Sequence, residues 1–230
     1  MRFVAALLAL LGLLFASGAY AQKKGTVAPA ATPSPLPALT PENTWVLDLS
    51  TGGRVLVQLR PDKAPGHVER IKTLTRAGFY NGLMFHRVID GFMAQGGDPQ
   101  GTGQGGSPLP DLKAEFNDLP HVRGVVSMAR AESNDSANSQ FYIMLMPTLR
   151  LDNRYTAFGR VVSGMQFVDA IEKGEPPVNP SRIVRAWIQA DGENAPLRPL
   201  PAVAAPVPVA SPTPAPAPQP VPSPTPTPNN

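Results

Sequence analysis

The sequence contains no cysteine among its 230 residues. This absence excludes disulfide bonds, thiol nucleophiles and cysteine-based metal sites. Histidine is also scarce: His67, His86 and His121 lie far apart, without the short spacing that is typical of metal ligands. We therefore expect these histidines to be helix, core or loop residues, and we expect no metal site.

Charge is sparse as well. The formal net charge is +3, and the basic residues are scattered along the chain without forming a run. A nucleic-acid-binding surface needs a concentrated basic patch, so we expect no nucleic-acid partner. The nucleophile motif G-x-S-x-G is absent too, and nothing else in the sequence resembles an activated nucleophile.

Bulky apolar side chains are rare in two segments. From Pro196 onward proline alternates with Ala, Val, Ser and Thr, and 14 of the 29 prolines lie there. Such a composition favours polyproline II and cannot build a core. We therefore expect a disordered Pro-rich tail over residues 195–230, whose removal leaves the stability unchanged. Residues 22–42 form a similar Pro/Ala-rich linker, so one domain of ordinary size remains, residues 43–194.

The first residues have the pattern of a secretory signal peptide. Arg2 precedes an apolar run from Val4 to Phe15, and Ala19-Tyr20-Ala21 is a small-residue cleavage site. The alternative is an uncleaved membrane anchor, but a spanning helix needs about 20 apolar residues and this run is shorter. We expect residues 1–21 to be removed, leaving no integral membrane span, and the protein to be exported to the periplasm or secreted.

Short alternating apolar runs bounded by glycine-rich turns predict an all-β core. Val55, Val57 and Leu59 alternate with other side chains just after a turn at Gly52 and Gly53, which predicts a hairpin. We expect strands at 45–50, 53–59, 84–89, 92–97, 124–129, 140–145, 157–163 and 181–191, and helices at 64–78 and 165–174. Many short strands with two helices favour a mostly antiparallel barrel that is capped by the helices.

Gly101, Gly103 and Gly106 spell G-x-G-x-x-G, the fingerprint of a dinucleotide-binding loop. Such a loop must lead into a helix whose N-terminus holds the phosphates. Here Pro108 and Pro110 follow the glycines and make a poor helix start. The pattern therefore favours a mobile glycine-rich loop over a nucleotide site.

Arg87 is the one charged residue inside an otherwise apolar strand, Met84 to Ile89. Arginine is rarely placed among apolar residues without a partner. One interpretation is a structural ion pair or an edge-strand charge. The other is a fixed cation beside an apolar pocket. The composition alone leaves both open.

Three segments together resemble the cyclophilin family of peptidyl-prolyl cis-trans isomerases. They are FHRVIDGFMAQGGDP (residues 85–99), GVVSMARA (124–131) and SQFYI (139–143). The resemblance runs from about Trp45 to Asp191. It implies a closed eight-stranded antiparallel barrel capped by two helices, and a reaction that rotates X-Pro peptide bonds without any cofactor.

The resemblance also implies the residues of the site. Arg87 matches the family's catalytic arginine, and Gln95 and Gln140 are expected to orient Arg87 and the substrate backbone. The implied substrate-binding residues are Phe92, Met93, Gly103, Ala129, Arg130, Ala131, Tyr142, Leu151 and Tyr155.

The sequence departs from the family at three positions in or beside this site. Tyr142 and Tyr155 stand where phenylalanine and histidine are common, and they conserve the shape of the pocket. Arg150 is a sharper departure, because animal cyclophilins that bind cyclosporin tightly carry tryptophan there. We expect an active site that binds cyclosporin poorly.

Three hypotheses about function follow. The first is an exported prolyl isomerase, monomeric, that acts on proline-containing segments of unfolded or folding proteins in the cell envelope. The second is a binding or chaperone module that holds such segments with little turnover. The third is an interaction protein that works through its proline-rich tail. Turnover of a short Ala-Pro peptide distinguishes the first hypothesis from the second.

Overall fold

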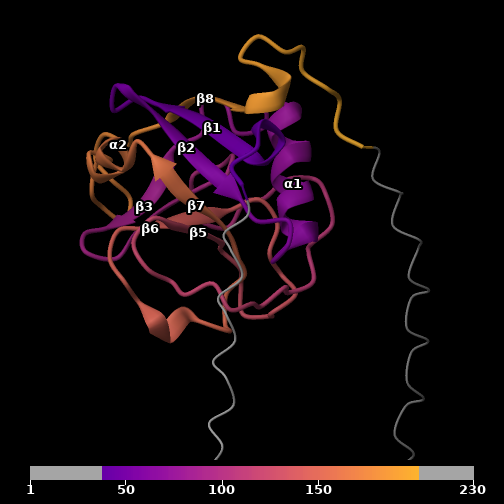
Figure 1. Ribbon diagram of the computed structural model, residues 1–230. Helices are drawn as coiled ribbons and strands as arrows, with labels where there is room; N and C mark the ends of the chain where they lie inside the picture. Colours follow the sequence, from indigo (N-terminus) through magenta and orange to yellow (C-terminus); the bar gives the residue numbers. More distant parts are fainter. Residues whose placement is uncertain (1–37, 202–230) are drawn as a thin grey trace, which may run out of the picture. The chain divides into compact units, whose positions relative to one another are not determined.

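The computed structural model describes residues 38–201, and its strands form one curled antiparallel sheet (Figure 1). The sheet begins with a hairpin in which Trp45 pairs with Val57 and Leu47 with Val55. Gly52, at φ 94°, closes the turn between the two strands, a conformation that glycine adopts without penalty. The strands are β1 (Thr44–Leu49), β2 (Gly53–Leu59), β3 (Phe85–Ile89), β4 (Met93–Gly96), β5 (Val125–Met128), β6 (Phe141–Met144), β7 (Ala157–Ser163) and β8 (Ile183–Ile188).

The sheet is open, and the prediction of a closed barrel was wrong. Its strand order is β3-β4-β6-β5-β7-β2-β1-β8, so β3 and β8 are its two edges. The two edges meet only where β3 and β8 begin, through a few backbone hydrogen bonds. In one of them the N–H of Phe85 donates to the Ser181 carbonyl at 2.9 Å. Farther along β3, Val88 exchanges two backbone hydrogen bonds with Gly174. Because this loop residue occupies the edge of β3, β8 cannot pair along it.

Side chains that alternate along the strands form two separate apolar clusters, one on each face of the sheet. Trp45 and Phe141 are fully buried on the inner face, with their ring centroids 5.0 Å apart in an edge-to-face contact. On the outer face Met93 lies opposite Met144, and Gln95 lies opposite Tyr142. Because successive side chains of a strand point to opposite faces, β4 and β6 present a second apolar cluster away from the core. This outer cluster supports the site described below.

Two α-helices lie on opposite sides of the curled sheet in the described part of the chain (Figure 1). α1 (Pro65–Arg76) buries Val68, Ile71 and Leu74 against the core, as the helical spacing of these residues predicted. α2 (Met165–Asp169) is shorter than the expected helix, because the chain must leave it to reach the pairing of Gly174 with β3.

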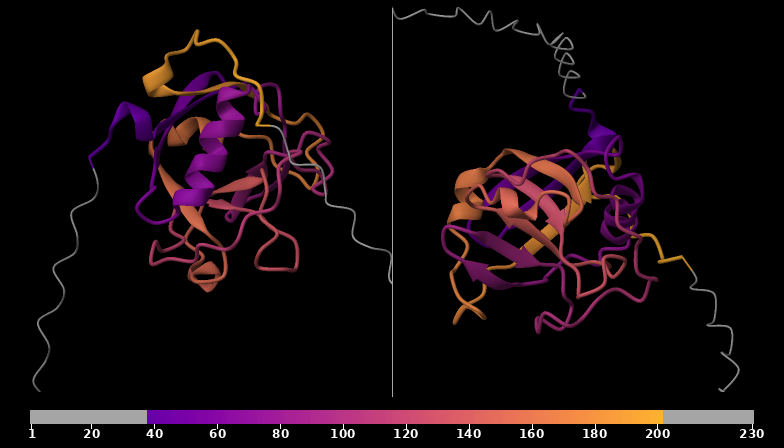
Figure 2. Two further views of the ribbon diagram at one scale, coloured as in Figure 1. Left: turned by 90° about the vertical axis from the view of Figure 1, so that its right-hand side faces the viewer. Right: turned by 90° about the horizontal axis from the view of Figure 1, so that it is seen from below.

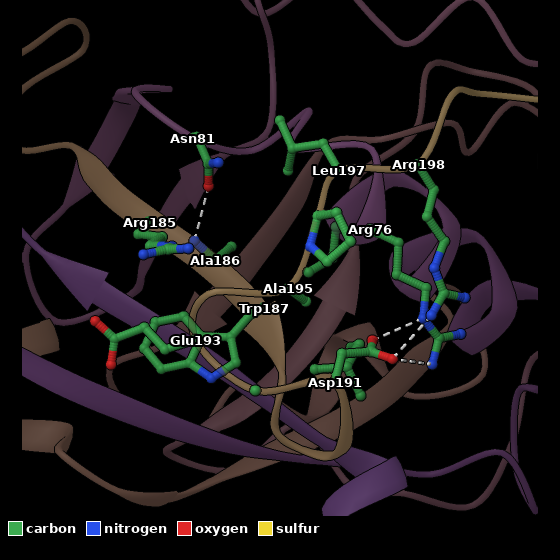
Figure 3. Close-up of a pocket in the computed structure, with 14 residues that line it drawn as sticks. Arg76, Asn81, Arg185, Ala186, Trp187, Asp191, Glu193, Ala195, Leu197 and Arg198 are labelled. Atoms are coloured by element: carbon green, nitrogen blue, oxygen red, sulfur yellow. Dashed lines mark hydrogen bonds and ion pairs between the residues drawn. The ribbon is translucent and has the colours of Figure 1, made fainter.

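The first residues of the expected tail lie on the domain. We name residues 192–201 the C-terminal strap; the strap runs beside α1 (Figure 2). The Arg198 N–H donates to the Arg76 carbonyl at 2.8 Å, and the Arg198 guanidinium pairs with Asp191 at 3.2 Å (Figure 3). Leu200 is partly buried and packs against the core. The strap is therefore part of the folded domain, contrary to our expectation for residues 195–201.

The other end of the domain is tied to the same helix. Glu42, which we placed in the linker, pairs with Lys72 and Arg76 of α1, each at 3.1 Å. The predicted signal peptide 1–21, most of the linker and residues 202–230 of the predicted tail lie outside the described residues. Among residues 38–201, no helix has the length and apolarity that a membrane crossing requires.

Candidate active site

The structure gathers the predicted site residues on the outer face of β4 and β6. Most of them surround one pocket of about 160 Å³. The residues that line it are Arg87, Phe92, Met93, Gln95, Ala129, Arg130, Tyr142, Leu151 and Tyr155. The three other predicted residues, Gly103, Ala131 and Gln140, line an adjoining groove, which shares Gln95, Ala129 and Arg130 with the pocket. An extended peptide could therefore run from one depression into the other.

The floor of the pocket is apolar and rigid. Met93 and Tyr142 are 2% and 5% exposed, and the ring of Tyr155 meets that of Tyr142 edge-on at 5.9 Å. Burial raises the pKa of Tyr142 far above its usual value, so the hydroxyl stays neutral. The floor thus offers a flat apolar surface to a ring of the size of proline.

A buried polar chain supports the floor from behind. The His121 ring stacks on Tyr142 with centroids 6.2 Å apart. Its Nδ1 lies 2.8 Å from the Asp152 carboxylate, and its Nε2 lies 2.9 Å from the Ser127 hydroxyl. Burial lowers the pKa of His121 despite the opposing effect of Asp152. A neutral ring that donates from Nδ1 to Asp152 and accepts at Nε2 from Ser127 satisfies all three groups.

This Asp-His-Ser chain is not a hydrolytic triad. Ser127 is fully buried and His121 is 1% exposed, so no substrate carbonyl can reach the hydroxyl. The chain instead ties β5 to the segment that carries Leu151 and Tyr155. We had expected His121 to be a core or loop residue, but the isolated positions of the three residues in the sequence gave no sign of the chain.

Arg87 projects from β3 at the edge of the pocket, with 42% of its side chain exposed. Its Nε donates to the Glu175 carboxylate at 2.7 Å. Gln95 does not bond Arg87 as we had expected; its amide donates to Gln140 at 2.9 Å. Glu175 is therefore the polar partner of Arg87, and the sequence reasoning missed it because 88 residues separate the two.

Residues 98–106, the glycine loop, fold around the carboxylate of Asp98, the first residue of the loop. Asp98 is 1% exposed and accepts hydrogen bonds from the backbone N–H groups of Gln100, Thr102, Gly103 and Gly105, at 2.6–3.2 Å. Burial alone would raise the pKa of Asp98, but these donors outweigh it and hold the pKa below its usual value. The N–H groups that would cradle a phosphate in a dinucleotide loop are thus occupied, which argues against the nucleotide interpretation.

Gln140 joins the glycine loop to the pocket. Its amide nitrogen donates to the carbonyls of Gly103 and Gly105 at 3.0 and 2.8 Å, while its oxygen accepts from Gln95. Every polar atom of the Gln140 side chain is thus directed by a neighbour. Gln140, like Gln95, does not bond Arg87 as we had expected; it couples the loop to β4.

Arg130 forms the boundary between the pocket and the adjoining groove. Its guanidinium lies 4.8 Å above the Tyr155 ring and donates to the carbonyls of Arg154, Ala131 and Glu132. Arg150, by contrast, is exposed, and its guanidinium lies 5.9 Å from the centre of the Phe92 ring. It directly precedes Leu151, which lines the pocket.

No group of three or more His, Asp and Glu side chains in the described ranges could hold a metal ion. The pocket presents the guanidinium groups of Arg87 and Arg130, the amide of Gln95 and an apolar floor. Such a set can bind and polarise a peptide, but it offers no accessible nucleophile.

The sequence matches the profile of the family "cyclophilin type peptidyl-prolyl cis-trans isomerase/CLD" over residues 46–188. A relative in Brucella suis, named as a probable peptidyl-prolyl cis-trans isomerase, is 49% identical; the alignment covers 67% of this chain and 86% of the relative. Peptidyl-prolyl cis-trans isomerase B of Bacillus subtilis is 43% identical, and the alignment covers 55% of this chain and 89% of the Bacillus protein.

Solved structures give the same result. A cyclophilin of Hirschia baltica superimposes with a TM-score of 0.62 at 30% identity, covering 66% of this chain and 76% of its own. A cyclophilin-type isomerase of Cryptosporidium parvum, crystallised in the presence of the dipeptide Ala-Pro, gives a TM-score of 0.59 at 27% identity, over 63% of this chain and 98% of its own. The chain belongs to the cyclophilin-type peptidyl-prolyl cis-trans isomerase family.

Proposed function

We propose that the protein catalyses the cis-trans isomerisation of X-Pro peptide bonds in unfolded or folding proteins of the cell envelope. The observation that carries the proposal is the position of Arg87, a fixed cation at the edge of an apolar pocket floored by Met93 and Tyr142. Family membership supports the reaction type. The polar groove beside the pocket supports a peptide substrate that is longer than a dipeptide.

The reaction requires rotation about a bond with partial double-bond character. The barrier is about 18–20 kcal/mol, while the two isomers of X-Pro differ by only about 0.5–1 kcal/mol. No bond is broken, so the reaction needs no nucleophile, metal or cofactor. As the amide twists, the proline nitrogen regains its lone pair and becomes a better hydrogen-bond acceptor.

A donor that gains strength only in the twisted state lowers the barrier. The guanidinium of Arg87 is such a donor, since its Nη groups carry N–H bonds that the Glu175 contact leaves free. A 10⁵-fold acceleration corresponds to about 7 kcal/mol, whereas one charge-assisted hydrogen bond contributes about 1.5–3 kcal/mol. Fixing the proline ring on the apolar floor and excluding water must contribute the rest.

The test is turnover of a short Ala-Pro peptide by the protein and by Arg87→Ala. We expect the variant to lose about 10²–10³-fold in kcat/KM while it keeps its melting temperature. Arg160→Ala is the matched control, because Arg160 is an exposed arginine of β7 outside both depressions. Binding of the peptide without acceleration would instead favour the alternative of a binding or chaperone module.

The place of action is part of the same proposal. The N-terminal pattern supports cleavage after Ala21 and export to the periplasm or the medium. We propose that the isomerase domain, together with Glu42 and the C-terminal strap, acts as a monomer. N-terminal sequencing of protein from a periplasmic fraction should begin at Gln22, and light scattering on the purified protein should give the mass of one chain.

A further inference from the structure

A loop between α2 and β8 approaches Arg87 from outside the pocket. We name residues 172–181 the Glu175 loop. Its base is closed by the Glu172 N–H, which donates to the Ser181 hydroxyl at 3.1 Å. Its middle is fixed to β3, because Gly174 and Val88 exchange two backbone hydrogen bonds at 2.8 and 2.9 Å. The backbone therefore places Glu175 beside Arg87, whatever the Glu175 side chain contributes.

The backbone at this point requires glycine. Gly174 has φ 146°, and a Cβ on it would come within 2.6–2.8 Å of the backbone of Pro176 and Pro177. A residue with a side chain would push these atoms apart and displace Glu175. The loop thus has the features of a built support and not of a chance contact between two exposed charges.

The Glu175 carboxylate engages one side of the guanidinium only. The contact joins Oε2 of Glu175 to Nε of Arg87 at 2.7 Å. Among residues 38–201 no other group accepts a hydrogen bond from Arg87. The two Nη groups, which lie farthest from the backbone, therefore keep all four of their N–H bonds for a peptide in the pocket.

We propose that Glu175 is a positioning residue for the isomerase reaction: it holds Nε of Arg87 so that the Nη groups point toward the twisted X-Pro bond. This inference rests on the proposed function. A long arginine side chain loses rotamer freedom when it is fixed. In this protein the carboxylate fixes the side chain before the substrate binds, so less ordering remains for the transition state.

The carboxylate could instead compete with the substrate for Arg87. Exposure argues against strong competition, since the two side chains are 42% and 50% exposed and water screens such pairs to small net energies. Glu175 occupies Nε, whereas the proposed mechanism uses the Nη groups for the substrate. The two therefore use different donors of the same guanidinium.

The experiment compares three variants of the full chain on an Ala-Pro peptide. Glu175→Ala should lower kcat about two- to five-fold, the range expected for an exposed ion pair, with little change in KM. Glu175→Gln keeps an oxygen that can accept from Nε and should retain at least half of the wild-type kcat. Glu172→Ala removes a carboxylate of the same loop that makes no hydrogen bond or ion pair with any residue of 38–201, and it should have no effect.

Two readouts separate positioning from a structural role. Raising the salt concentration to 1 M screens the pair, so it should lower kcat of the wild type toward that of Glu175→Ala and leave the variant unchanged. In an Arg87→Lys background, where no Nε exists, Glu175→Ala should add almost nothing. The melting temperatures of all variants should agree within about 1 °C, because backbone bonds hold the loop.

Three outcomes would overturn the inference. They are an unchanged kcat in Glu175→Ala, a raised kcat, which would make Glu175 a competitor, and an equal loss in the Glu172→Ala control. Failure of the unmodified protein to accelerate isomerisation would instead refute the proposed function itself. The two failures are therefore distinguishable in one set of assays.

Discussion

The amide of Gln95, in β4, donates to the amide oxygen of Gln140, which directly precedes β6, at 2.9 Å. This bond orients Gln140 so that its own N–H groups reach the carbonyls of the glycine loop. The polar side of the site is therefore one connected unit.

We expect Gln140→Ala to lower kcat/KM about five- to tenfold, because two carbonyls of the groove rim lose a donor that is worth about 1 kcal/mol in total. The loss should appear mainly in KM for longer peptides, which reach the groove. Gln140→Glu keeps the acceptor for Gln95 but places a charge against the two carbonyls, so it should be no better than alanine. Gln100→Ala, an exposed change in the same loop that lies outside the pocket and the groove, serves as the control.

Stability should fall on acidification from pH 7 to pH 5. His67, His86 and His121 are all buried, and burial lowers the pKa of each. The unfolded chain then binds more protons below about pH 6.5, so the stabilisation is complete above that pH and is lost as the pH falls toward the folded-state pKa values.

The measurement is the melting temperature between pH 8 and pH 5, where we expect a decrease of about 5 °C. His86→Phe should flatten this dependence, because no described group bonds either nitrogen of that ring. Turnover at 25 °C should stay nearly constant from pH 6.5 to pH 8.5, since none of the three rings lines the pocket. A steep bell-shaped profile in this range would show that a histidine takes part in the reaction.

Cyclosporin should inhibit the protein poorly. Arg150 is exposed at the pocket rim and points its charge toward the Phe92 ring. It cannot supply the flat apolar wall and the indole N–H of tryptophan, and it holds its charge in water. The loss of about 2–3 kcal/mol corresponds to roughly 30- to 150-fold in affinity.

Arg150→Trp should therefore increase sensitivity to cyclosporin at least tenfold with little change in turnover. An inhibitor titration on both proteins tests this expectation. Tight inhibition of the unmodified protein would mean that another side chain supplies the wall.

Truncation should separate the strap from the rest of the predicted tail. A chain that ends at residue 194 loses the bond of Arg198 to Arg76, its pair with Asp191 and the packing of Leu200. We expect its melting temperature to fall by about 3–6 °C, as for a loss of about 1.5 kcal/mol in a domain of this size. A chain that ends at residue 201 should match the full-length protein, and both truncated chains should keep their turnover of a short peptide. Equal melting temperatures for the two truncations would show that the strap contributes nothing.

Local patterns predicted most of the strands, whereas the resemblance to the cyclophilin family supplied the site residues. Phe92, Met93 and Gln95 belong to one motif, and the structure places Met93 and Gln95 in β4, places Phe92 just before it, and puts all three in the pocket lining. The eight strands were predicted because each is a short apolar run between turns. The open edge of the sheet was not predicted, because it depends on how Val88 pairs with Gly174 across the fold.

Contacts between distant segments were missed for the same physical reason. Glu175 stands in a proline-rich loop to which the sequence analysis assigned no role, and the pairing of Gly174 with β3 brings it to Arg87. Composition also misjudged Leu200, since a single leucine among prolines packs against the hydrophobic core. The order of residues along the chain contains no direct sign of either contact.

Asp98 has a consequence for how the groove can respond to its substrate. A loop that binds an external anion must exchange water for its ligand each time, and its shape depends on what is present. The carboxylate that this loop binds is the side chain of its own Asp98, so it is always present beside the N–H groups. The folded loop satisfies these N–H groups with its own Asp98, so the rim of the groove takes its shape without an added anion. The free energy of substrate binding is then not needed to order the loop and can serve to hold the proline ring. In this loop the glycines allow the backbone N–H groups to approach Asp98 closely, and they do not make the loop flexible.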